Sequence, residues 1–256
     1  MNTHLREKFE GIVGAINEIY ELDEQGCTSV VRKIITEEAS YLLKSSFKEK
    51  YREWLKSEAL VLEKLNNKNL IQVPTYYGFI EDTESSHIIM SFETGITLTS
   101  ALKKAINTGE KKSLYRSFGQ FLNQLHEINT IESLNPKNDW LNEQLIKAEH
   151  HVKSGKTDGN LQLLEKLQLN KPLPVPQTII HGDCTTDNVL VVDGEVRLFI
   201  DVSGMTVGDP RYDESLAIRN FVNNDEFKKA FYEGYIRYTV SMEEFQYFDQ
   251  GLYEFF

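Results

Sequence analysis

Two short apolar runs on either side of Asp193-Gly194 constrain the fold of this chain more than any other feature. Residues 188–192 and 195–200 are rich in β-branched side chains, which favour strands. An Asp-Gly pair between two such runs is a strong signal for a β-hairpin turn. The sequence therefore predicts a hairpin whose second strand leads to Asp201.

Most of the sequence around this hairpin has helical periodicity. In residues 112–128, five apolar side chains form one stripe, as expected for a helix that packs on a core. These are Leu114, Phe118, Phe121, Leu122 and Leu125. After the hairpin, further helices are expected at residues 211–222, 226–239 and 243–254.

The first 92 residues have a different pattern, which is typical of a small sheet with one or two helices. Helical spacing occurs in residues 6–20 and 48–65. In the second of these segments the expected apolar face consists of Trp54, Leu55, Ala59, Leu62 and Leu65. Strand-like runs lie at residues 30–35, 40–44, 76–80 and 87–91.

The change of pattern falls near residues 92–95. Because a sheet precedes this point and mostly helices follow it, the expected fold class is α+β with two lobes, residues 1–92 and 93–256. A chain of 256 residues can bury a sizeable core without a disulfide or a metal.

The composition argues against several classes of protein. The formal net charge of −11 repels phosphate backbones, so nucleic acid is not an expected partner. The chain lacks a run of 18 apolar residues and an apolar signal-peptide core, so no membrane association is expected. Cys27 and Cys184 do not have metal-ligand spacing, which suits a reducing compartment. We therefore expect a cytoplasmic protein.

Three oxygen-bearing side chains flank the hairpin. Asp183 and Asn188 lie five residues apart before its first strand, and Asp201 follows its second strand. Asn188 and Asp201 carry the hard oxygen atoms that Mg²⁺ prefers as ligands. Asp183 could orient and deprotonate an attacking hydroxyl group. Such a combination is typical of phosphoryl transfer.

This segment resembles the aminoglycoside phosphotransferase family, whose members are relatives of the protein kinases. The family pattern is His-Gly-Asp-x-x-x-x-Asn, a hairpin and Ile-Asp, and it is complete here as His181, Gly182, Asp183, Asn188, Ile200 and Asp201. A trailing Gly-Asp-Pro-x-x-Asp is also present as Gly208, Asp209, Pro210 and Asp213. The resemblance implies a two-lobed protein-kinase-like fold and transfer of the γ-phosphate of ATP or GTP, as its Mg²⁺ complex, to a hydroxyl group. It makes Asp183 catalytic and Asn188 and Asp201 metal ligands.

Asp213 is expected to be a structural brace that caps the next helix, and His126 to be structural as well. Protein-kinase activity is not expected, because the His-Arg-Asp and Asp-Phe-Gly motifs are absent from the sequence.

The resemblance also implies a nucleotide site in the first lobe. Lys44 would bind the α- and β-phosphates and pair with Glu58, for which Glu53 and Glu63 are the alternatives. A loop near Cys27 would contact phosphate, and a segment near residue 92 would contact adenine. The expected nucleotide-binding residues of these two segments are Gly26, Thr28, Ser29, Met90, Ser91 and Glu93.

The chain ends in Leu-Tyr-Glu-Phe-Phe. Aminoglycoside 3′-phosphotransferases end in a similar Leu-Asp-Glu-x-Phe, whose acidic groups hold the ammonium groups of the drug. The resemblance therefore implies that Glu254 and Phe256 bind a small, possibly cationic substrate, while Tyr253 stands where that subgroup has aspartate. The segment between His126 and His181 is short and neutral, unlike the acidic substrate loop of those enzymes.

The sequence is consistent with three functions. The first is phosphorylation of an aminoglycoside antibiotic. The second is phosphorylation of another hydroxylated metabolite, such as an amino sugar, an amino alcohol or a nucleoside. The third is nucleotide binding by a regulatory protein without turnover. The intact set of Lys44, Asp183, Asn188 and Asp201 argues against the third.

Overall fold

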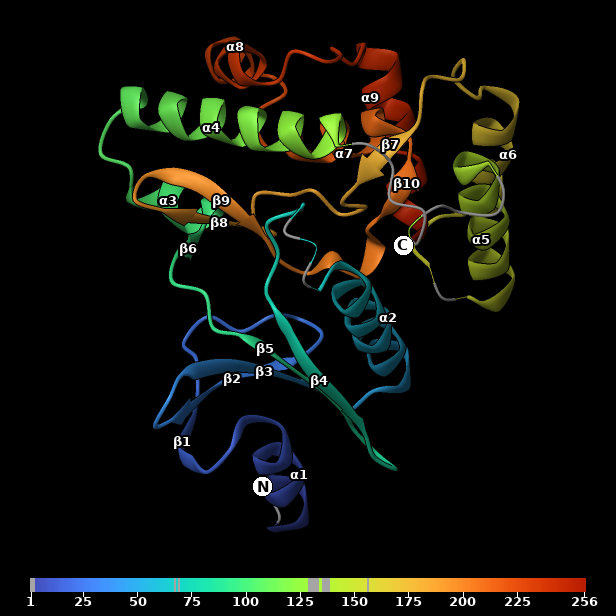
Figure 1. Ribbon diagram of the computed structural model, residues 1–256. Helices are drawn as coiled ribbons and strands as arrows, with labels where there is room; N and C mark the ends of the chain where they lie inside the picture. Colours follow the sequence, from blue (N-terminus) through green and yellow to red (C-terminus); the bar gives the residue numbers. More distant parts are fainter. Residues whose placement is uncertain (1–2, 67, 69, 129–133, 135–138, 156) are drawn as a thin grey trace. The chain divides into compact units, whose positions relative to one another are not determined.

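The computed structural model divides into two compact units, whose elements are labelled in Figure 1. Unit 1 consists of Met1–Gly95 and Leu198–Ser203, and unit 2 of Ile96–Arg197 and Gly204–Phe256. The first unit thus runs a few residues past the boundary expected at residue 92, and it takes in a short segment that begins with the last two residues of the hairpin. The described residues are 3–66, 68, 70–128, 134, 139–155 and 157–256.

Unit 1 is built on a five-stranded antiparallel sheet with the strand order β1-β2-β3-β5-β4. The four strand-like runs of the sequence are confirmed as β2 to β5, and β1 is an additional strand. The strands are β1 (Ile16–Glu21), β2 (Val30–Thr36), β3 (Ser40–Ser46), β4 (Tyr76–Glu81) and β5 (Ser86–Ser91). The helices are α1 (Thr3–Val13) and α2 (Glu49–Leu65).

Residues 6–20 do not form one helix, as their spacing had indicated, but a helix followed by a strand. The helix α1 stops before Gly14, whose φ of 83° lies in the left-handed region that ends helices. Ile16 then begins β1, which pairs with β2. The apolar spacing continues across the break because Phe9, Val13 and Ile16 all pack into the same hydrophobic cluster.

Helix α2 begins and ends close to the expected residues, but its buried face differs from the expected one. Trp54 is 40% exposed, and the Lys50 ammonium lies 4.7 Å from the centre of its ring. The side chains that are buried instead include an acid. They are Leu55, Glu58, Ala59, Val61, Leu62 and Leu65. A buried carboxylate on an amphipathic helix needs a cationic or hydrogen-bonding partner.

Unit 2 is mainly helical, and α4 and α8 lie side by side in it (Figure 1). Its α-helices are α3 (Leu98–Lys104), α4 (Thr108–Glu127), α5 (Trp140–Ser154), α6 (Leu161–Leu169), α7 (Pro210–Ile218), α8 (Asp225–Gly234) and α9 (Met242–Phe248). Two 3₁₀-helices are η2 (Val202–Gly204) and η3 (Leu252–Phe255). None of the helices in the described part of the chain is long and apolar enough to cross a membrane.

Five short strands belong to two further sheets. One sheet has the order β6-β8-β9 and the other consists of β7 and β10. The strands are β6 (Ile96–Thr97), β7 (Thr178–Ile180), β8 (Val189–Val192), β9 (Glu195–Phe199) and β10 (Thr206–Gly208). The predicted hairpin is confirmed as β8 and β9. Its turn residues Asp193 and Gly194 have φ angles of 51° and 80°, as an Asp-Gly turn of this kind requires.

The three C-terminal helices are confirmed, but each is shorter than expected. Residues 235–241 separate α8 from α9. The hydroxyl of Ser241 accepts the backbone N–H of Glu244, while the Glu244 carboxylate accepts that of Ser241. This reciprocal cap fixes where α9 begins. The last turn of the chain is the separate 3₁₀-helix η3.

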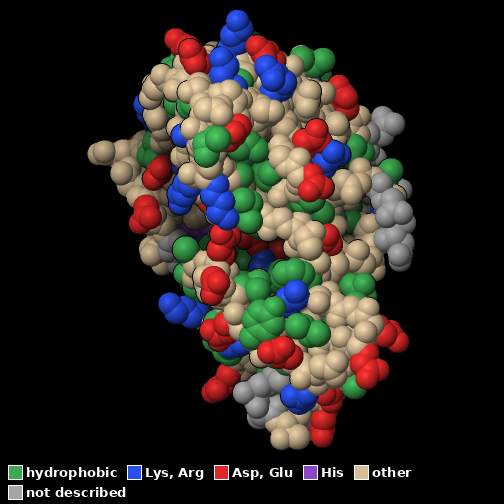
Figure 2. Space-filling model, turned by 90° about the vertical axis from the view of Figure 1, so that its left-hand side faces the viewer, with side chains coloured by type: hydrophobic (Ala, Val, Ile, Leu, Met, Phe, Trp, Pro, Cys, Tyr) green, Lys and Arg blue, Asp and Glu red, His purple; other side chains and the backbone are tan. Residues whose placement is uncertain are grey.

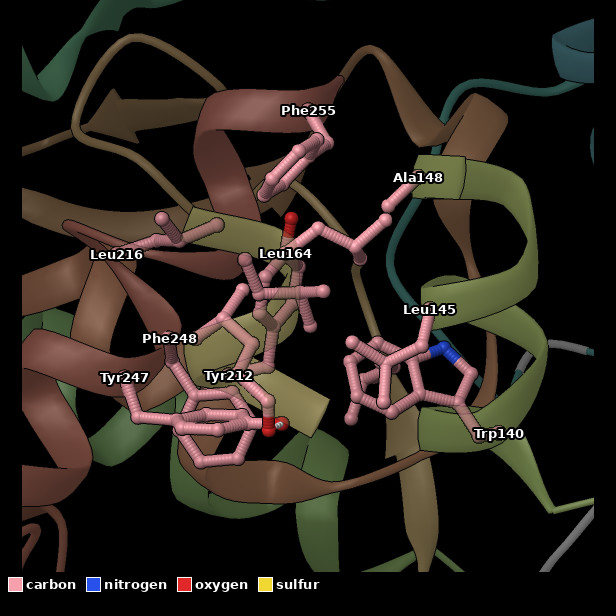
Figure 3. Close-up of a cluster of buried hydrophobic side chains, with 12 residues drawn as sticks. Trp140, Leu145, Ala148, Leu164, Tyr212, Leu216, Tyr247, Phe248 and Phe255 are labelled. Atoms are coloured by element: carbon pink, nitrogen blue, oxygen red, sulfur yellow. Dashed lines mark hydrogen bonds between the residues drawn. The ribbon is translucent and has the colours of Figure 1, made fainter. Parts of the chain in front are cut away.

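The core of unit 2 gathers side chains from α5, α6, α7, α9 and η3, as Figure 3 shows. Its buried residues are Trp140, Leu145, Ala148, Leu164, Leu167, Ile180, Tyr212, Leu216, Tyr247, Phe248, Leu252 and Phe255. Phe255 is fully buried although it is the penultimate residue. The C-terminal segment is therefore part of the core.

The excess acid of the chain is dispersed over the surface. On the face drawn in Figure 2, Asp and Glu side chains are interspersed with Lys and Arg side chains. Several of these acids form exposed ion pairs, for example Glu81 with Lys56 in unit 1 and Glu233 with Arg116 in unit 2. Such pairs contribute little to stability but moderate the field of an acidic protein.

Candidate active site

The loop of residues 181–188 follows β7 and is held by Asp213 of α7. The fully buried Asp213 carboxylate accepts the backbone N–H of His181 at 2.6 Å and that of Gly182 at 2.9 Å. Gly182 has a φ of 84°, and a Cβ atom there would lie 2.4 Å from the carbonyl oxygen of Gly204. Only glycine fits this position, so the path of the loop is fixed.

The expectation that Asp213 caps α7 is wrong, because Asp209 does so. Asp209 Oδ1 accepts the backbone N–H of Arg211 at 3.0 Å. Asp213 lies within the helix and braces the loop instead. Behind it, His126 Nε2 lies 3.3 Å from Asp213 Oδ2, and His126 Nδ1 lies 2.9 Å from the hydroxyl of Tyr235. His126 is 1% exposed, which confirms the expected structural role.

Both carboxylate oxygens of Asp183 have a hydrogen-bond donor within unit 2. The Asn188 amide donates to Oδ2 at 2.8 Å, and it also donates to the Asp183 backbone carbonyl at 2.8 Å. The hydroxyl of Tyr253 donates to Oδ1 at 3.1 Å. The Asp183 side chain is therefore oriented by groups from its own loop and from the C-terminal segment.

These bonds also orient Asn188. Its amide nitrogen faces Asp183, so its side-chain oxygen is the atom that could hold a cation, and the residue is 8% exposed. The described part of the chain has no group of three or more His, Cys, Asp or Glu side chains arranged to hold a metal. The side-chain oxygen of Asn188 is a hard donor of the kind that Mg²⁺ accepts.

In unit 1, Lys44 of β3 pairs with two carboxylates. Its Nζ lies 2.8 Å from Oε2 and 3.1 Å from Oε1 of Glu58, and it also contacts Asp201 Oδ1. Burial lowers the pKa of Lys44, but the Asp201 and Glu58 carboxylates more than offset this effect, so the pKa is raised overall. The alternatives Glu53 and Glu63 are exposed on α2. The structure therefore pairs Lys44 with the preferred glutamate.

Asp201 lies two residues beyond the end of β9 and has an unusual backbone. Its φ is 57°, in the left-handed region that few residues other than glycine adopt. Its side chain is 48% exposed although it pairs with the buried Lys44. Sparsely populated backbone conformations of this kind concentrate at functional sites.

The loop between β1 and β2 holds Gly26, Thr28 and Ser29. The Gln25 side chain closes it, because its amide donates to the Val31 carbonyl at 2.8 Å and its oxygen accepts the Val31 N–H at 2.8 Å. The Ser29 hydroxyl lies 2.7 Å from the Ser46 hydroxyl. A Cβ atom at Gly26 would meet nothing within 4 Å, so the fold does not require glycine there.

The expected adenine-binding segment lies at the end of β5. Met90 is 2% exposed within the sheet. The Ser91 N–H donates to the Thr75 carbonyl at 2.9 Å, and the Ser91 hydroxyl bonds the Glu93 carboxylate. Because this N–H is already bonded, the predicted contacts with adenine are now the carbonyl group of Ser91 and the backbone of Glu93.

The C-terminal segment reaches the site through a residue that the sequence did not single out for binding. Tyr253, which stands where the resembling subgroup has aspartate, bonds Asp183. The Glu254 carbonyl accepts hydrogen bonds from the Gly159 N–H and the Thr157 hydroxyl, while its side chain is exposed. The Phe256 ring packs edge-on against His151. The feature of the sequence that pointed to this contact was the position of Tyr253, where the resembling subgroup has an aspartate.

The two cysteines differ in exposure. Cys184, in the 181–188 loop, is fully buried, and burial raises the pKa of its thiol well above the ordinary value. Cys27 is exposed. An alkylating reagent is therefore expected to reach Cys27 and not Cys184.

A known protein family accounts for most of these residues. The sequence profile of the phosphotransferase enzyme family matches residues 20–246. The chain belongs to this family. The match covers the candidate site residues discussed above except those of the C-terminal segment. No curated protein sequence matches the chain.

Solved structures share the fold of this phosphotransferase at low sequence identity. An aminoglycoside-3′-phosphotransferase of type VIII is 19% identical, with a TM-score of 0.77 and full coverage of both chains. A thermostable mutant of aminoglycoside phosphotransferase APH(4)-Ia, in a ternary complex with AMP-PNP and hygromycin B, is 16% identical, with a TM-score of 0.66 over 90% of this chain and 82% of that one. Spectinomycin phosphotransferase APH(9)-Ia, in complex with ADP and spectinomycin, is 17% identical, with a TM-score of 0.62 over 97% and 83%.

The predicted fold class is thereby confirmed. This phosphotransferase has the mixed α+β kinase fold of these enzymes, with an antiparallel sheet in its N-terminal unit and a mainly helical remainder.

Proposed function

We propose that this phosphotransferase transfers the γ-phosphoryl group of ATP or GTP to a hydroxyl group of a small molecule. The observation that carries the proposal is the Asp183 carboxylate, which is held on a braced loop with Asn188 bonded to its Oδ2. A fixed carboxylate can accept the proton of an acceptor hydroxyl while that oxygen attacks phosphorus.

The nucleotide is assigned to residues of unit 1. Lys44, kept charged by Glu58 and Asp201, would contact the α- and β-phosphates. The loop residues Gly26, Thr28 and Ser29 would lie along the phosphates. Met90, the Ser91 carbonyl and the Glu93 backbone would line the adenine site. Relatives of similar fold have been solved with ADP and AMP-PNP, which supports a nucleotide co-substrate.

Asn188 and Asp201 are the residues that would hold Mg²⁺. When bound, Mg²⁺ would neutralise phosphate charge during transfer. The two residues supply an amide oxygen and a carboxylate, which are ligand types that Mg²⁺ accepts. The chain's own contribution is to hold these two ligands, through the Asn188–Asp183 bonds and the Lys44–Asp201 pair.

An aminoglycoside is the leading acceptor. The names of the structural relatives support it, as does the exposed acid Glu254 beside the C-terminus. In this proposal Glu254 binds a cationic group of the acceptor, and Phe256 contacts the same acceptor. The second candidate, another hydroxylated metabolite, is favoured by one observation, namely that a neutral tyrosine and not a carboxylate contacts Asp183 from the tail.

A panel of acceptors tests the proposal. Purified protein is mixed with Mg·ATP or Mg·GTP and with aminoglycosides, amino sugars, amino alcohols or nucleosides, and nucleoside diphosphate release is measured. The proposal expects acceptor-dependent release and a phosphorylated product visible by mass spectrometry. Glu254→Gln should lower the affinity for an aminoglycoside acceptor but not the affinity for a neutral acceptor. Nucleotide binding without phosphorylation of any acceptor would favour the regulatory alternative.

A further inference from the structure

The contact between Tyr253 and Asp183 is not explained by any role assigned so far. The two residues are 70 positions apart, yet the Tyr253 hydroxyl lies 3.1 Å from Oδ1 of Asp183. Asn188 bonds the other carboxylate oxygen at 2.8 Å. One donor on each oxygen fixes the plane of the carboxylate, which a single donor would leave free to rotate.

Tyr253 is itself held from several sides. The guanidinium carbon of Arg219 lies 4.5 Å from the centre of the Tyr253 ring, and Arg219 Nε lies 3.0 Å from Asp249 Oδ1. The neighbours of Tyr253 in η3, Leu252 and Phe255, are fully buried. The backbone of η3 is therefore anchored in the core of unit 2, and the phenol is pre-placed at Asp183.

The protonation state of Tyr253 suits a donor. Burial and the nearby Asp183 charge together raise its pKa to about 12, although Arg219 lowers it. The phenol therefore keeps its proton throughout the neutral range. A protonated phenol beside a carboxylate acts as the hydrogen-bond donor, so the 3.1 Å contact is donated by Tyr253 to Asp183.

We propose that Tyr253 is a positioning residue for phosphoryl transfer, which orients the Asp183 carboxylate through its hydroxyl, with Arg219 and Asp249 as its support. The inference rests on the proposed function and deepens it. Tyr253 acts through Asp183 and not on the reacting atoms. An acceptor hydroxyl must then share Oδ1 of Asp183 with the Tyr253 hydroxyl or displace that hydroxyl from it.

The test compares Tyr253→Phe with Tyr238→Phe. The hydroxyl of Tyr238 also donates to a carboxylate of unit 2, that of Glu244, at 3.1 Å. Tyr238→Phe therefore loses a comparable hydrogen bond at another place in the same unit. The kcat and the KM for Mg·ATP are measured with water alone and with kanamycin as probes. Tyr253→Phe should lower kcat about tenfold and leave the KM for Mg·ATP unchanged. Tyr238→Phe should change neither.

The inference is overturned if Tyr253→Phe keeps the wild-type kcat. A second measurement does not need activity. In protein carrying ¹³Cζ-tyrosine, the Tyr253 resonance, assigned by its loss in Tyr253→Phe, should move in Asp183→Ala at pH 7. An unmoved resonance also overturns the inference. If the resonance moves while the wild type turns over no Mg·ATP with any acceptor, the contact stands and only the proposed function fails.

Discussion

Nζ of Lys44 lies 2.8 Å from Oε2 of Glu58, across 14 residues of sequence, and the two side chains are 12% and 6% exposed. A lysine this deeply placed remains charged only beside carboxylates, and Asp201 supplies the second one. The ammonium group is thus fixed in position before any nucleotide binds.

Replacing Glu58 tests this pair. Glu58→Gln should leave unit 1 folded but lower turnover roughly 100-fold, because Lys44 loses the charge that orients it. Glu53→Gln is the matched control, since Glu53 is exposed on the same helix. Steady-state kinetics and a melting curve check both variants. Equal activity in the two variants would remove Glu58 from the nucleotide site.

The resemblance to the phosphotransferase family implied this pair, and the local strand and helix patterns placed Lys44 on a strand and Glu58 on the helix that follows it. The sequence also predicted the hairpin through Asp193, since turn chemistry is local. The Tyr253–Asp183 contact could not be predicted, because it joins residues 70 apart through a tertiary fold that no periodicity specifies. Strand β1 was missed for a related reason, namely that one apolar cluster accepts Phe9 from a helix and Ile16 from a strand.

A second prediction concerns Gly182. Gly182→Ala should destabilise unit 2 by about 2 kcal/mol or more and abolish turnover, because the added Cβ meets the Gly204 carbonyl and φ is positive. Gly26→Ala should change stability by less than about 0.5 kcal/mol, since its Cβ would enter open space. Urea unfolding measures both, and a stable, active Gly182→Ala would contradict the fixed path of the loop.

A third prediction follows from a buried acid. Burial raises the pKa of Glu214 from 4.5 to about 7, while hydrogen bonds from Tyr232 and the Val240 N–H lower it, Glu244 raises it and Arg211 lowers it. The folded state thus binds the Glu214 proton more tightly than the unfolded state. The stability contribution is complete below about pH 4.5 and is lost as the pH rises through about 7, a difference of about 3 kcal/mol.

Glu214→Gln should abolish this loss, because an amide carries no charge at any of these pH values. The free energy of unfolding is measured in urea at pH 5 and pH 8. The variant should gain stability relative to the wild type at pH 8 more than at pH 5. Glu243→Gln, at an exposed position of α9, serves as control. The same difference between Glu214→Gln and wild type at both pH values would refute the assignment.

A fourth prediction uses the cysteines. Iodoacetamide should label Cys27 and spare Cys184 in the folded protein, because Cys184 is fully buried with a raised thiol pKa. Denatured protein should be labelled at both. If the β1–β2 loop contacts phosphate, saturating Mg·ATP should slow the labelling of Cys27, as followed by peptide mass spectrometry. An unchanged rate of Cys27 labelling would show that this loop does not contact the nucleotide.

The measurement that most directly tests the account compares Asp183→Ala with Asp187→Ala, an exposed aspartate of the same loop. Turnover is measured with the best acceptor of the panel, and nucleotide affinity by calorimetry with Mg·AMP-PNP. Loss of a general base costs roughly 10²–10⁴-fold in rate, so Asp183→Ala should be nearly inactive while it binds nucleotide normally, and Asp187→Ala should match the wild type. An Asp183→Ala variant with more than about a tenth of wild-type activity would contradict the central claim that this carboxylate activates the acceptor hydroxyl.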